Sequence, residues 1–138
     1  MGDAIDYRAV LSILGERVEL PPDPSLARLE WFPNPRPATP FTVTFNCEEF
    51  TSRCPLTRQP DFGYLTIEYQ PRERCLESKS LNLYLGAYRE TGAFWEDLAN
   101  RITDDIHAAI QPEWITVKME MNVRGGIGMT VAAARGER

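Results

Sequence analysis

The sequence predicts an α+β domain in which an antiparallel four-stranded sheet has two helices on one face. The stretches with strand character alternate apolar and polar residues, which is typical of strands that bury only one face. Two helical stretches follow one another between the second and the third strand, so the order is ββααββ. This order favours two layers, with both helices packed on the same side of the sheet.

The bulk composition indicates a single domain without a nucleic-acid partner. The chain has 138 residues, of which 43% are hydrophobic and 25% charged, and a domain usually holds roughly 100–200 residues. The net charge of −5 argues against nucleic acid, which needs a basic surface. The sequence shows neither a signal peptide nor an apolar run that could span a membrane, so we expect a cytoplasmic location and no membrane partner.

Cysteine and histidine residues are too few for an ordinary zinc site. Cys47, Cys54 and Cys75 contain no Cys-x-x-Cys pair, and His107 is the only histidine. A zinc site would need most of these ligands at once. We therefore expect reduced cysteines and no metal.

The chain is expected to divide into three parts. Residues 1–40 form an N-terminal arm that is proline-rich from residue 21, residues 41–131 form the folded domain, and residues 132–138 form a frayed tail. In the arm, Ala4–Leu14 has helix-like apolar spacing, and seven prolines between residues 21 and 40 predict extended chain. Four apolar residues predict that the arm packs on its own domain or on a neighbouring subunit: Leu26, Leu29, Trp31 and Phe32.

The elements of the domain follow from apolar periodicity. Alternation with a period of two predicts four strands, over Phe41–Phe50, Tyr64–Tyr69, Trp114–Val123 and Ile127–Val131. Apolar residues three and four apart predict two helices, over Glu77–Arg89 and Phe94–Ile110. Glu96 and Asp97 lie in the first turn of the second helix, where the helix dipole favours negative charge.

The stretch from Asn46 to Gly63 is the candidate functional segment. It contains two prolines and a glycine, so it cannot be regular strand throughout, and long loops inside compact domains are usually functional. Cys54 and, seven residues on, Asp61 suit a thiolate nucleophile with an acid beside it. The alternative is that Cys54 is a small buried apolar residue.

Several motifs agree in order and spacing with one enzyme family over roughly residues 31–128. They are Phe45-Asn46-Cys47, Phe50-Thr51-Ser52, Cys54-Pro55 and Thr57–Phe62, then Glu77-Ser78-Lys79-Ser80-Leu81, Leu83-Tyr84-Leu85 and Arg89, then Gly92, Phe94 and Glu96-Asp97, and finally Arg124-Gly125-Gly126-Ile127. These motifs resemble the 7-cyano-7-deazaguanine reductases of the short, single-module type. Those enzymes are the nitrile reductases of queuosine biosynthesis, a tRNA modification pathway.

The resemblance implies a fold and an assembly. The family has the tunnelling fold, in which the sheets of several subunits join into ring barrels, and two rings stack. A homo-oligomer is therefore expected, with short members forming a decamer of two pentamers. Active sites of the family lie between subunits, and Glu77 and Glu96 are expected to come from different subunits.

The resemblance also implies a reaction on a small deazapurine nitrile. Cys54 would attack the nitrile carbon to give a covalent thioimide, and Asp61 would supply the proton for the nitrogen. Two hydride transfers from NADPH would then give 7-aminomethyl-7-deazaguanine.

Further site residues carry over by position. Substrate binding is implied for Leu76, Glu77, Ser78, Phe94, Trp95 and Glu96, and cofactor binding for Ser78, Lys79, Arg124 and Gly125. The alternatives are a solvated helix face for Glu77 and Glu96, core packing for Phe94 and an ordinary surface lysine for Lys79. Cys47 and Cys75 are interpreted as structural.

The sequence departs from the family pattern at several positions. Trp95 stands in place of a histidine that is thought to assist proton supply, Asn82 in place of a second lysine, and Ala87 in place of a serine. The segment after Gly126 also lacks the usual ending. Two other functions therefore stay open: a relative that adds ammonia to the thioimide and gives an amidine, and a non-catalytic deazapurine-binding protein. Retention of both Cys54 and Asp61 argues against the second.

Overall fold

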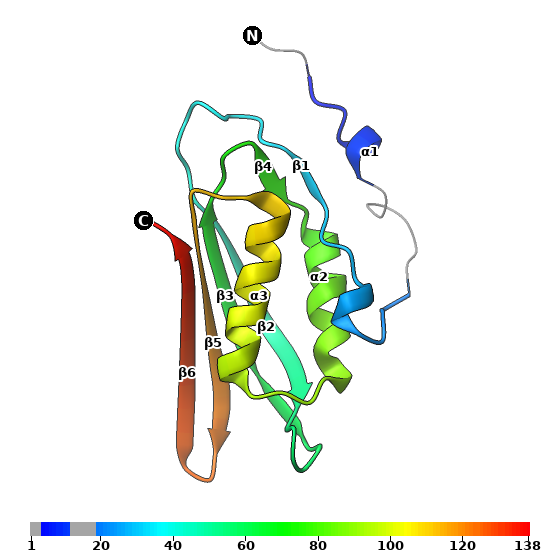
Figure 1. Cartoon of the computed structure of the whole chain (residues 1–138), viewed down its shortest axis with the longest axis vertical. Coiled ribbons are helices and arrows are strands. Elements are labelled where there is room, and N and C mark those ends of the chain that lie inside the picture. The colour runs from blue at the N-terminus through cyan, green and yellow to red at the C-terminus, as the bar shows by residue number, and fades with distance from the viewer. Residues whose placement is uncertain (1–3, 12–18) are drawn as a thin grey trace.

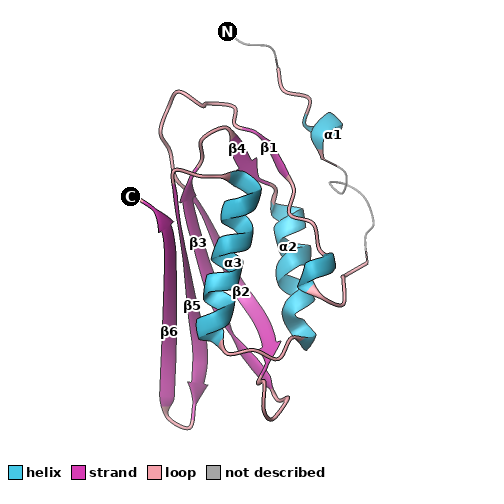
Figure 2. Cartoon of the chain, in the orientation of Figure 1, coloured by secondary structure: helices cyan, strands magenta, loops and turns pink. Residues whose placement is uncertain are grey.

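The computed structural model describes residues 4–11 and 19–138 and has the predicted α+β layers. Its four-stranded sheet is antiparallel in the order β2-β3-β5-β6, formed by β2 (Val43–Arg53), β3 (Pro60–Gln70), β5 (Trp114–Arg124) and β6 (Ile127–Gly136). Helices α2 (Ser78–Gly86) and α3 (Trp95–Ile110) lie side by side on one face of the sheet (Figures 1 and 2). The expected fold class is confirmed.

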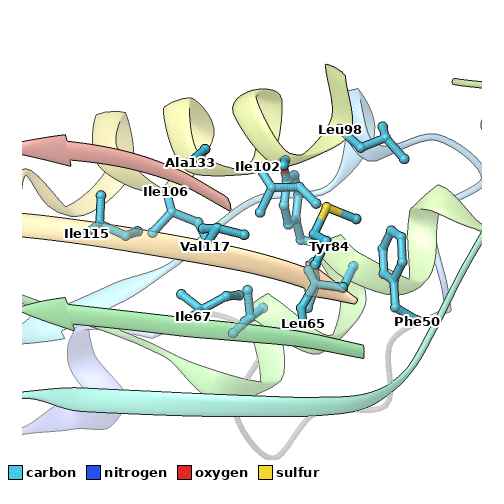
Figure 3. Close-up of a cluster of buried hydrophobic side chains, with 14 of the residues drawn as sticks. Phe50, Leu65, Ile67, Tyr84, Leu98, Ile102, Ile106, Ile115, Val117 and Ala133 are labelled. Atoms are coloured by element: carbon cyan, nitrogen blue, oxygen red, sulfur yellow. The ribbon is translucent and has the colours of Figure 1, made fainter. Parts of the chain in front are cut away.

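The core lies between the helices and the sheet, where the apolar periodicity of the sequence placed it. Leu65 and Ile67 of β3 and Ile115 and Val117 of β5 are fully buried on the helix-facing side. The α3 stripe Leu98, Ile102, Ile106 and Ile110 packs on them, and so does Tyr84 of α2 (Figure 3). Burial of these side chains fixes the two helices on the sheet. The ends of the strands are thereby fixed relative to the ends of the helices, and the candidate polar residues lie at these ends.

The first two strands are longer than the alternation predicted. Strands β2 and β3 pair as far as Arg53 and Pro60, so only residues 54–59 form the connecting loop of a long hairpin. A register shift between Cys47 and Phe50 marks a bulge in β2. Pro60 is tolerated because it stands at the first position of its strand.

The expectation of a frayed tail over residues 132–138 is wrong as far as Gly136. Strand β6 continues to Gly136, which pairs with Trp114 at the start of β5. The Arg135 guanidinium also donates to Asp104 of α3 at 2.9 Å. The tail was missed because Ala132, Ala133 and Ala134 show no alternation, whereas the backbone pairing with β5 determines the strand.

The N-terminal arm packs on its own domain in the part that the structure describes. Strand β1 (Trp31–Pro33) pairs with β4 (Arg74–Leu76), two short strands that the sequence did not predict. Leu29 and Trp31 pack against the core, whereas Leu26, in the 3-10 helix η1 (Pro24–Leu26), is 68% exposed. Of the helix expected over Ala4–Leu14, the described residues 4–11 form only the single turn α1 (Tyr7–Val10), because Asp6 and Leu11 have extended backbone. Residues 12–14 lie outside the described ranges.

The helix expected over Glu77–Arg89 consists of two parts. Helix α2 ends at Gly86, and the 3-10 helix η2 (Ala87–Glu90) continues the chain toward α3. Ala87, which stands in place of the family's serine, is fully buried there. Within residues 4–11 and 19–138, none of the helices has the length and apolar character needed to cross a membrane.

Candidate active site

Cys54 begins the loop of the β2–β3 hairpin. Its backbone N–H donates to the Gln59 carbonyl at 2.8 Å, and its carbonyl accepts from the Arg58 N–H at 3.0 Å. Arg58 has a φ of +64°, a conformation that residues with a side chain rarely adopt. The loop is therefore a closed turn that presents the thiol at the tip of the hairpin.

The turn lowers the pKa of the Cys54 thiol below its ordinary value. The largest cause is a hydrogen bond with the Thr57 side chain, followed by the backbone N–H groups of Thr57 and Leu56. Burial and the nearby Asp61 carboxylate act weakly in the opposite direction. The thiol is partly exposed, so the alternative of a buried apolar cysteine does not apply, and the group has the properties of a nucleophile.

The same loop is tied to the segment that leads into α3. Arg53 donates its N–H to the Thr91 carbonyl at 2.8 Å and accepts from the Ala93 N–H at 3.2 Å, while its guanidinium pairs with Glu90 at 2.9 Å. Gly92 lies so close that a Cβ there would come within 3.3 Å of the Pro55 Cα. These contacts hold the thiol next to the start of α3.

Asp61 lies at the base of the loop and forms an ion pair with Arg124. It is 4% exposed and stands opposite Ser52 in the register of β2 and β3. The Arg124 side chain, 47% exposed at the end of β5, donates to one carboxylate oxygen of Asp61. The structure thus brings together Asp61, the candidate acid, and Arg124, for which the resemblance implies cofactor binding.

The backbone geometry of the turn after Arg124 explains why this turn contains two glycines. Gly125 has a φ of +58° and Gly126 a φ of +80°, and both connect β5 to β6. A Cβ at either position would meet nothing within 4 Å. The left-handed backbone, not packing within the protomer, is what favours glycine here.

The start of α3 presents two of its three candidate residues to the surface. Phe94 is 57% exposed, so its alternative of core packing is wrong, and Glu96 is also exposed. Trp95 points inward instead and is 1% exposed. Its indole N–H donates to the Ser52 hydroxyl at 2.9 Å, a contact that no feature of the sequence signalled.

The remaining candidates lie at the opposite end of the protomer. The Leu76 N–H donates to the Tyr69 hydroxyl oxygen, at the far end of β3, at 2.9 Å. Tyr69 is eight residues along β3 from Asp61, about 26 Å at the usual rise of a strand. The start of α2 therefore lies far from the loop of the β2–β3 hairpin within one chain (Figure 1). The four candidates at the end of β4 and the start of α2 are not brought together with Cys54: Leu76, Glu77, Ser78 and the half-buried Lys79.

Glu77 caps helix α2. Its two carboxylate oxygens accept from the Lys79 and Ser80 N–H groups, both at 2.7 Å. The side chain is 3% exposed, so the alternative of a solvated helix face is wrong. Capping satisfies two of the N–H groups that a helix start leaves without partners, and it fixes the direction of the exposed Ser78.

Ser78 and Asn82 line a groove between α2 and strand β2. The groove has a volume of about 490 Å³, and its opposite wall runs from Phe45 to Thr51. Asn82 stands in place of a family lysine, so this wall has one cation fewer. Among the described residues, no group of three His, Cys, Asp or Glu could hold a metal.

Comparison with known proteins identifies the family. A family model described as QueF-like protein matches residues 60–138. The NADPH-dependent 7-cyano-7-deazaguanine reductase of Anaeromyxobacter dehalogenans (strain 2CP-C) is 50% identical over 119 residues, which cover 86% of this chain and 97% of the relative. The reductase of the same name from Ruegeria pomeroyi is 45% identical over 126 residues, 91% of this chain and 81% of the relative.

A solved structure supports the fold. The apo form of the archaeosine synthase QueF-Like matches with a TM-score of 0.67 and 24% identity, over 72% of this chain and 98% of that chain. At this identity the likeness concerns the fold alone. The family model and the two reductases show that this chain belongs to the NADPH-dependent 7-cyano-7-deazaguanine reductase family.

Proposed function

We propose that this protein reduces the nitrile of 7-cyano-7-deazaguanine to the aminomethyl group with NADPH, as a step of queuosine biosynthesis in the cytoplasm. The observation that carries the proposal is the Cys54 thiol, whose pKa is lowered by its own turn and which lies beside Asp61. The curated relatives that share about half of the sequence are named for this reaction. We infer that the amidine-forming and non-catalytic alternatives do not describe this chain.

The first step joins Cys54 to the substrate. The Cys54 thiol gives its proton to the Asp61 carboxylate, the thiolate sulfur forms a bond to the nitrile carbon, and Asp61 passes the proton to the nitrogen, which gives a neutral thioimide. A soft thiolate suits a nitrile carbon, and the covalent intermediate divides a difficult reduction into easier steps. The hairpin loop serves this step because it holds the sulfur at its tip and the carboxyl group at its base.

Bound NADPH would supply the two hydrides that reduce the carbon. The residues present fit an anionic cofactor, because Arg124 is part-exposed and the turn at Gly125 is open beside it. Lys79 and Ser78 at the start of α2 are the second place where phosphate groups would bind. When the thiolate leaves, we assign the return of its proton to Asp61, whose charge acts on the Cys54 thiol.

Substrate recognition is assigned to both ends of the protomer. Phe94 exposes its ring for stacking on the deazapurine, and the Glu96 carboxylate can accept two hydrogen bonds from a guanine-like edge. Ser78 in the α2 groove provides further polar contacts. The indole of Trp95 is buried, so we assign its part to the shape of the site behind Asp61.

The site is complete only between two copies of the chain. The distance along β3 between Asp61 and Tyr69 supports this, because α2 begins at the Tyr69 end. Among the residues that the structure describes, strands β2 and β6 each leave one edge without a partner in the order β2-β3-β5-β6, and pairing between copies would cover these edges. We propose a homo-oligomer that forms ring barrels, with a decamer of two pentamers as the expected state.

The test is intact-protein mass spectrometry after mixing with 7-cyano-7-deazaguanine. We expect an adduct of the mass of the substrate that is absent from Cys54→Ala and that disappears with NADPH as the aminomethyl product appears. Cys47 and Cys75 serve as internal controls, because burial raises the pKa of both thiols.

Two outcomes would contradict the proposal. An adduct that persists with NADPH but is discharged by ammonia would indicate amidine formation. The complete lack of an adduct in the wild-type protein would remove the nucleophile assignment and favour a binding protein.

A further inference from the structure

Arg58 has a backbone conformation that its residue type does not favour. Its φ of +64° lies in the left-handed region, where a Cβ comes too close to the following carbonyl oxygen. Glycine has no Cβ and adopts this conformation without that steric cost. Residues held in such conformations cluster at functional sites, where the surrounding structure compensates for the strain. An arginine at this position of the Cys54 turn therefore indicates that its side chain contributes something that glycine cannot.

The Arg58 side chain reaches across to the segment that leads into α3. Its Nη2 atom donates to the Glu90 carbonyl at 3.1 Å. Its Nη1 atom lies over Gly92, at 2.5 Å from the place where a Cβ on that residue would stand. The arginine is thus seated against two backbone positions of this segment, Glu90 and Gly92.

The backbone of Arg58 connects this side chain to the turn of the thiol. Its N–H donates to the Cys54 carbonyl at 3.0 Å, and its carbonyl accepts from the Arg53 guanidinium at 2.9 Å. The Arg53 guanidinium also pairs with the Glu90 carboxylate at 2.9 Å. Two arginines therefore hold Glu90, one by its side chain and the other by its backbone carbonyl, and Arg58 carries this contact into the turn.

Groups other than the Arg58 guanidinium lower the pKa of the Cys54 thiol. The largest cause is the hydrogen bond with the Thr57 side chain, followed by the Thr57 and Leu56 N–H groups. The Arg58 guanidinium is directed to the Glu90 carbonyl instead. Its effect on the reaction is therefore expected through the position of the turn, and not through the ionisation of Cys54.

We propose that Arg58 is a positioning residue, which keeps an unfavourable backbone conformation because its side chain clamps the Cys54 turn onto residues 90–92. The inference rests on the proposed function. The clamped segment ends two residues before Phe94, whose exposed ring is proposed to stack on the substrate. The clamp therefore sets how far the thiol stands from the bound substrate, and reacting groups tolerate little displacement.

The test replaces Arg58 by two residues that both lack the clamp but differ in backbone preference. Arg58→Gly suits the left-handed conformation, whereas Arg58→Ala keeps the strain. Both should form the adduct with 7-cyano-7-deazaguanine about three- to tenfold more slowly than the wild type, the effect of one lost hydrogen bond, as measured by rapid quench and intact mass. Arg58→Gly should nevertheless unfold at a higher urea concentration than Arg58→Ala. The adduct rate would then follow the clamp and not the stability of the fold.

A double variant tests the contact itself. In the wild type, the Cβ of Gly92→Ala would meet the Arg58 Nη1 atom at 2.5 Å, whereas with Arg58→Gly the nearest atom left is the Pro55 Cα at 3.3 Å. Gly92→Ala should therefore slow adduct formation less in Arg58→Gly than in the wild type, because residues in contact do not act independently.

Two controls separate the clamp from other effects of losing an arginine. Arg72 follows the opposite end of β3 and forms an exposed ion pair with Glu113 at 2.8 Å, so Arg72→Ala should form the adduct at the wild-type rate. The pH dependence of Cys54 alkylation by iodoacetamide, without substrate, should be the same in Arg58→Gly and the wild type, because the groups that lower the pKa of the thiol are retained.

The inference is overturned if Arg58→Gly forms the adduct as fast as the wild type, or if Arg58→Gly and Arg58→Ala unfold at the same urea concentration. Losses that multiply in the double variant would also overturn it, because the two residues would then act independently. A shifted alkylation curve in Arg58→Gly, or an equally slow adduct in Arg72→Ala, would have the same meaning. A wild-type protein without any adduct would instead overturn the proposed function.

Discussion

At the scale of single residues, Thr57 has the largest influence on the Cys54 thiol. Its hydroxyl and its backbone N–H both stabilise the thiolate and lower the pKa of Cys54. The residue lies in a stretch that resembles the family motif, but the sequence alone gave it no role. Its position three residues after Cys54, in a turn closed by two backbone hydrogen bonds, is what creates the contact.

Removing this hydroxyl should raise the pKa of Cys54. In Thr57→Ala the thiolate should appear at higher pH than in the wild type, because the largest stabilising interaction is lost. The pH dependence of Cys54 alkylation, followed by intact mass, measures the shift directly, and Thr57→Ser should keep the wild-type curve. If Cys54 has the same pKa in Thr57→Ala as in the wild type, the backbone N–H groups alone activate the thiol.

The contacts of Glu77 indicate a role other than the one that the resemblance implies. The resemblance assigns it to the substrate, whereas both of its carboxylate oxygens bind the first turn of α2. From sequence, Ser78 is the more usual capping residue type. The deciding fact is that Glu77 is buried beneath β1 and β4, where the Glu30 carbonyl also accepts from its N–H at 2.9 Å.

The cap predicts how Glu77 variants behave. Glu77→Ala should lower the free energy of unfolding by about 1 kcal/mol, and Glu77→Asp, which can still cap, should lower it by much less. Urea unfolding at a fixed protein concentration measures both. Equal stability of the wild type and Glu77→Ala, combined with a raised KM for the nitrile, would show that the carboxylate serves the substrate and not the helix.

At the scale of elements, the β2–β3 hairpin and the segment before α3 behave as one unit. Arg53 is bonded through both its N–H and its carbonyl to that segment, and Arg58 donates to the Glu90 carbonyl at 3.1 Å. Gly92 permits this approach, since any side chain there would point at Pro55 and Arg58. The unit sets the distance between the thiol and the exposed start of α3.

Gly92→Ala should therefore disturb the contact between the β2–β3 loop and the segment before α3. The added Cβ would lie 2.5 Å from the Arg58 Nη1 atom and 3.3 Å from the Pro55 Cα. The Arg58 side chain therefore has to move away from the Glu90 carbonyl and Pro55 has to shift by a few tenths of an ångström. Turnover should fall because reacting groups tolerate little displacement. Steady-state NADPH oxidation measures the loss. Gly128→Ala is the matched control, because its Cβ would approach nothing closer than 3.4 Å; an equal loss in both variants would contradict the explanation.

The elements that the sequence predicted correctly are those with a buried apolar face. The stripe of α3 and the alternation of β3 and β5 found the core because burial enforces a period. Strands β1, β4 and the end of β6 have no such period, and pairing with distant segments determines them. Residue type and spacing marked Cys54 and Asp61 only as a candidate pair, and the resemblance supplied their roles, which stay a prediction. The Ser52–Trp95 contact depends on how β2 meets α3 in space.

At the scale of the whole molecule, the candidate residues form two groups at opposite ends. The loop of the β2–β3 hairpin, the end of β5 and the start of α3 lie at one end, and the start of α2 lies toward the other (Figure 1). Helix α2 alone, with 9 residues, spans about 14 Å between them. No rearrangement of side chains can close this separation, so a joint site requires a neighbouring copy of the chain.

The separation of the two groups has a consequence for mixtures of variants: two proteins that are each inactive should rescue each other. Cys54→Ala lacks the nucleophile, and a variant with both Ser78→Ala and Lys79→Ala lacks the proposed phosphate contacts at the start of α2, so mixed rings contain some sites that take an intact half from each neighbour. Random mixing in equal amounts, after unfolding and refolding together, should restore about a quarter of the wild-type activity, because each half is intact with a chance of about one in two. Activity that stays at the level of the separate variants would mean that each chain builds its site alone.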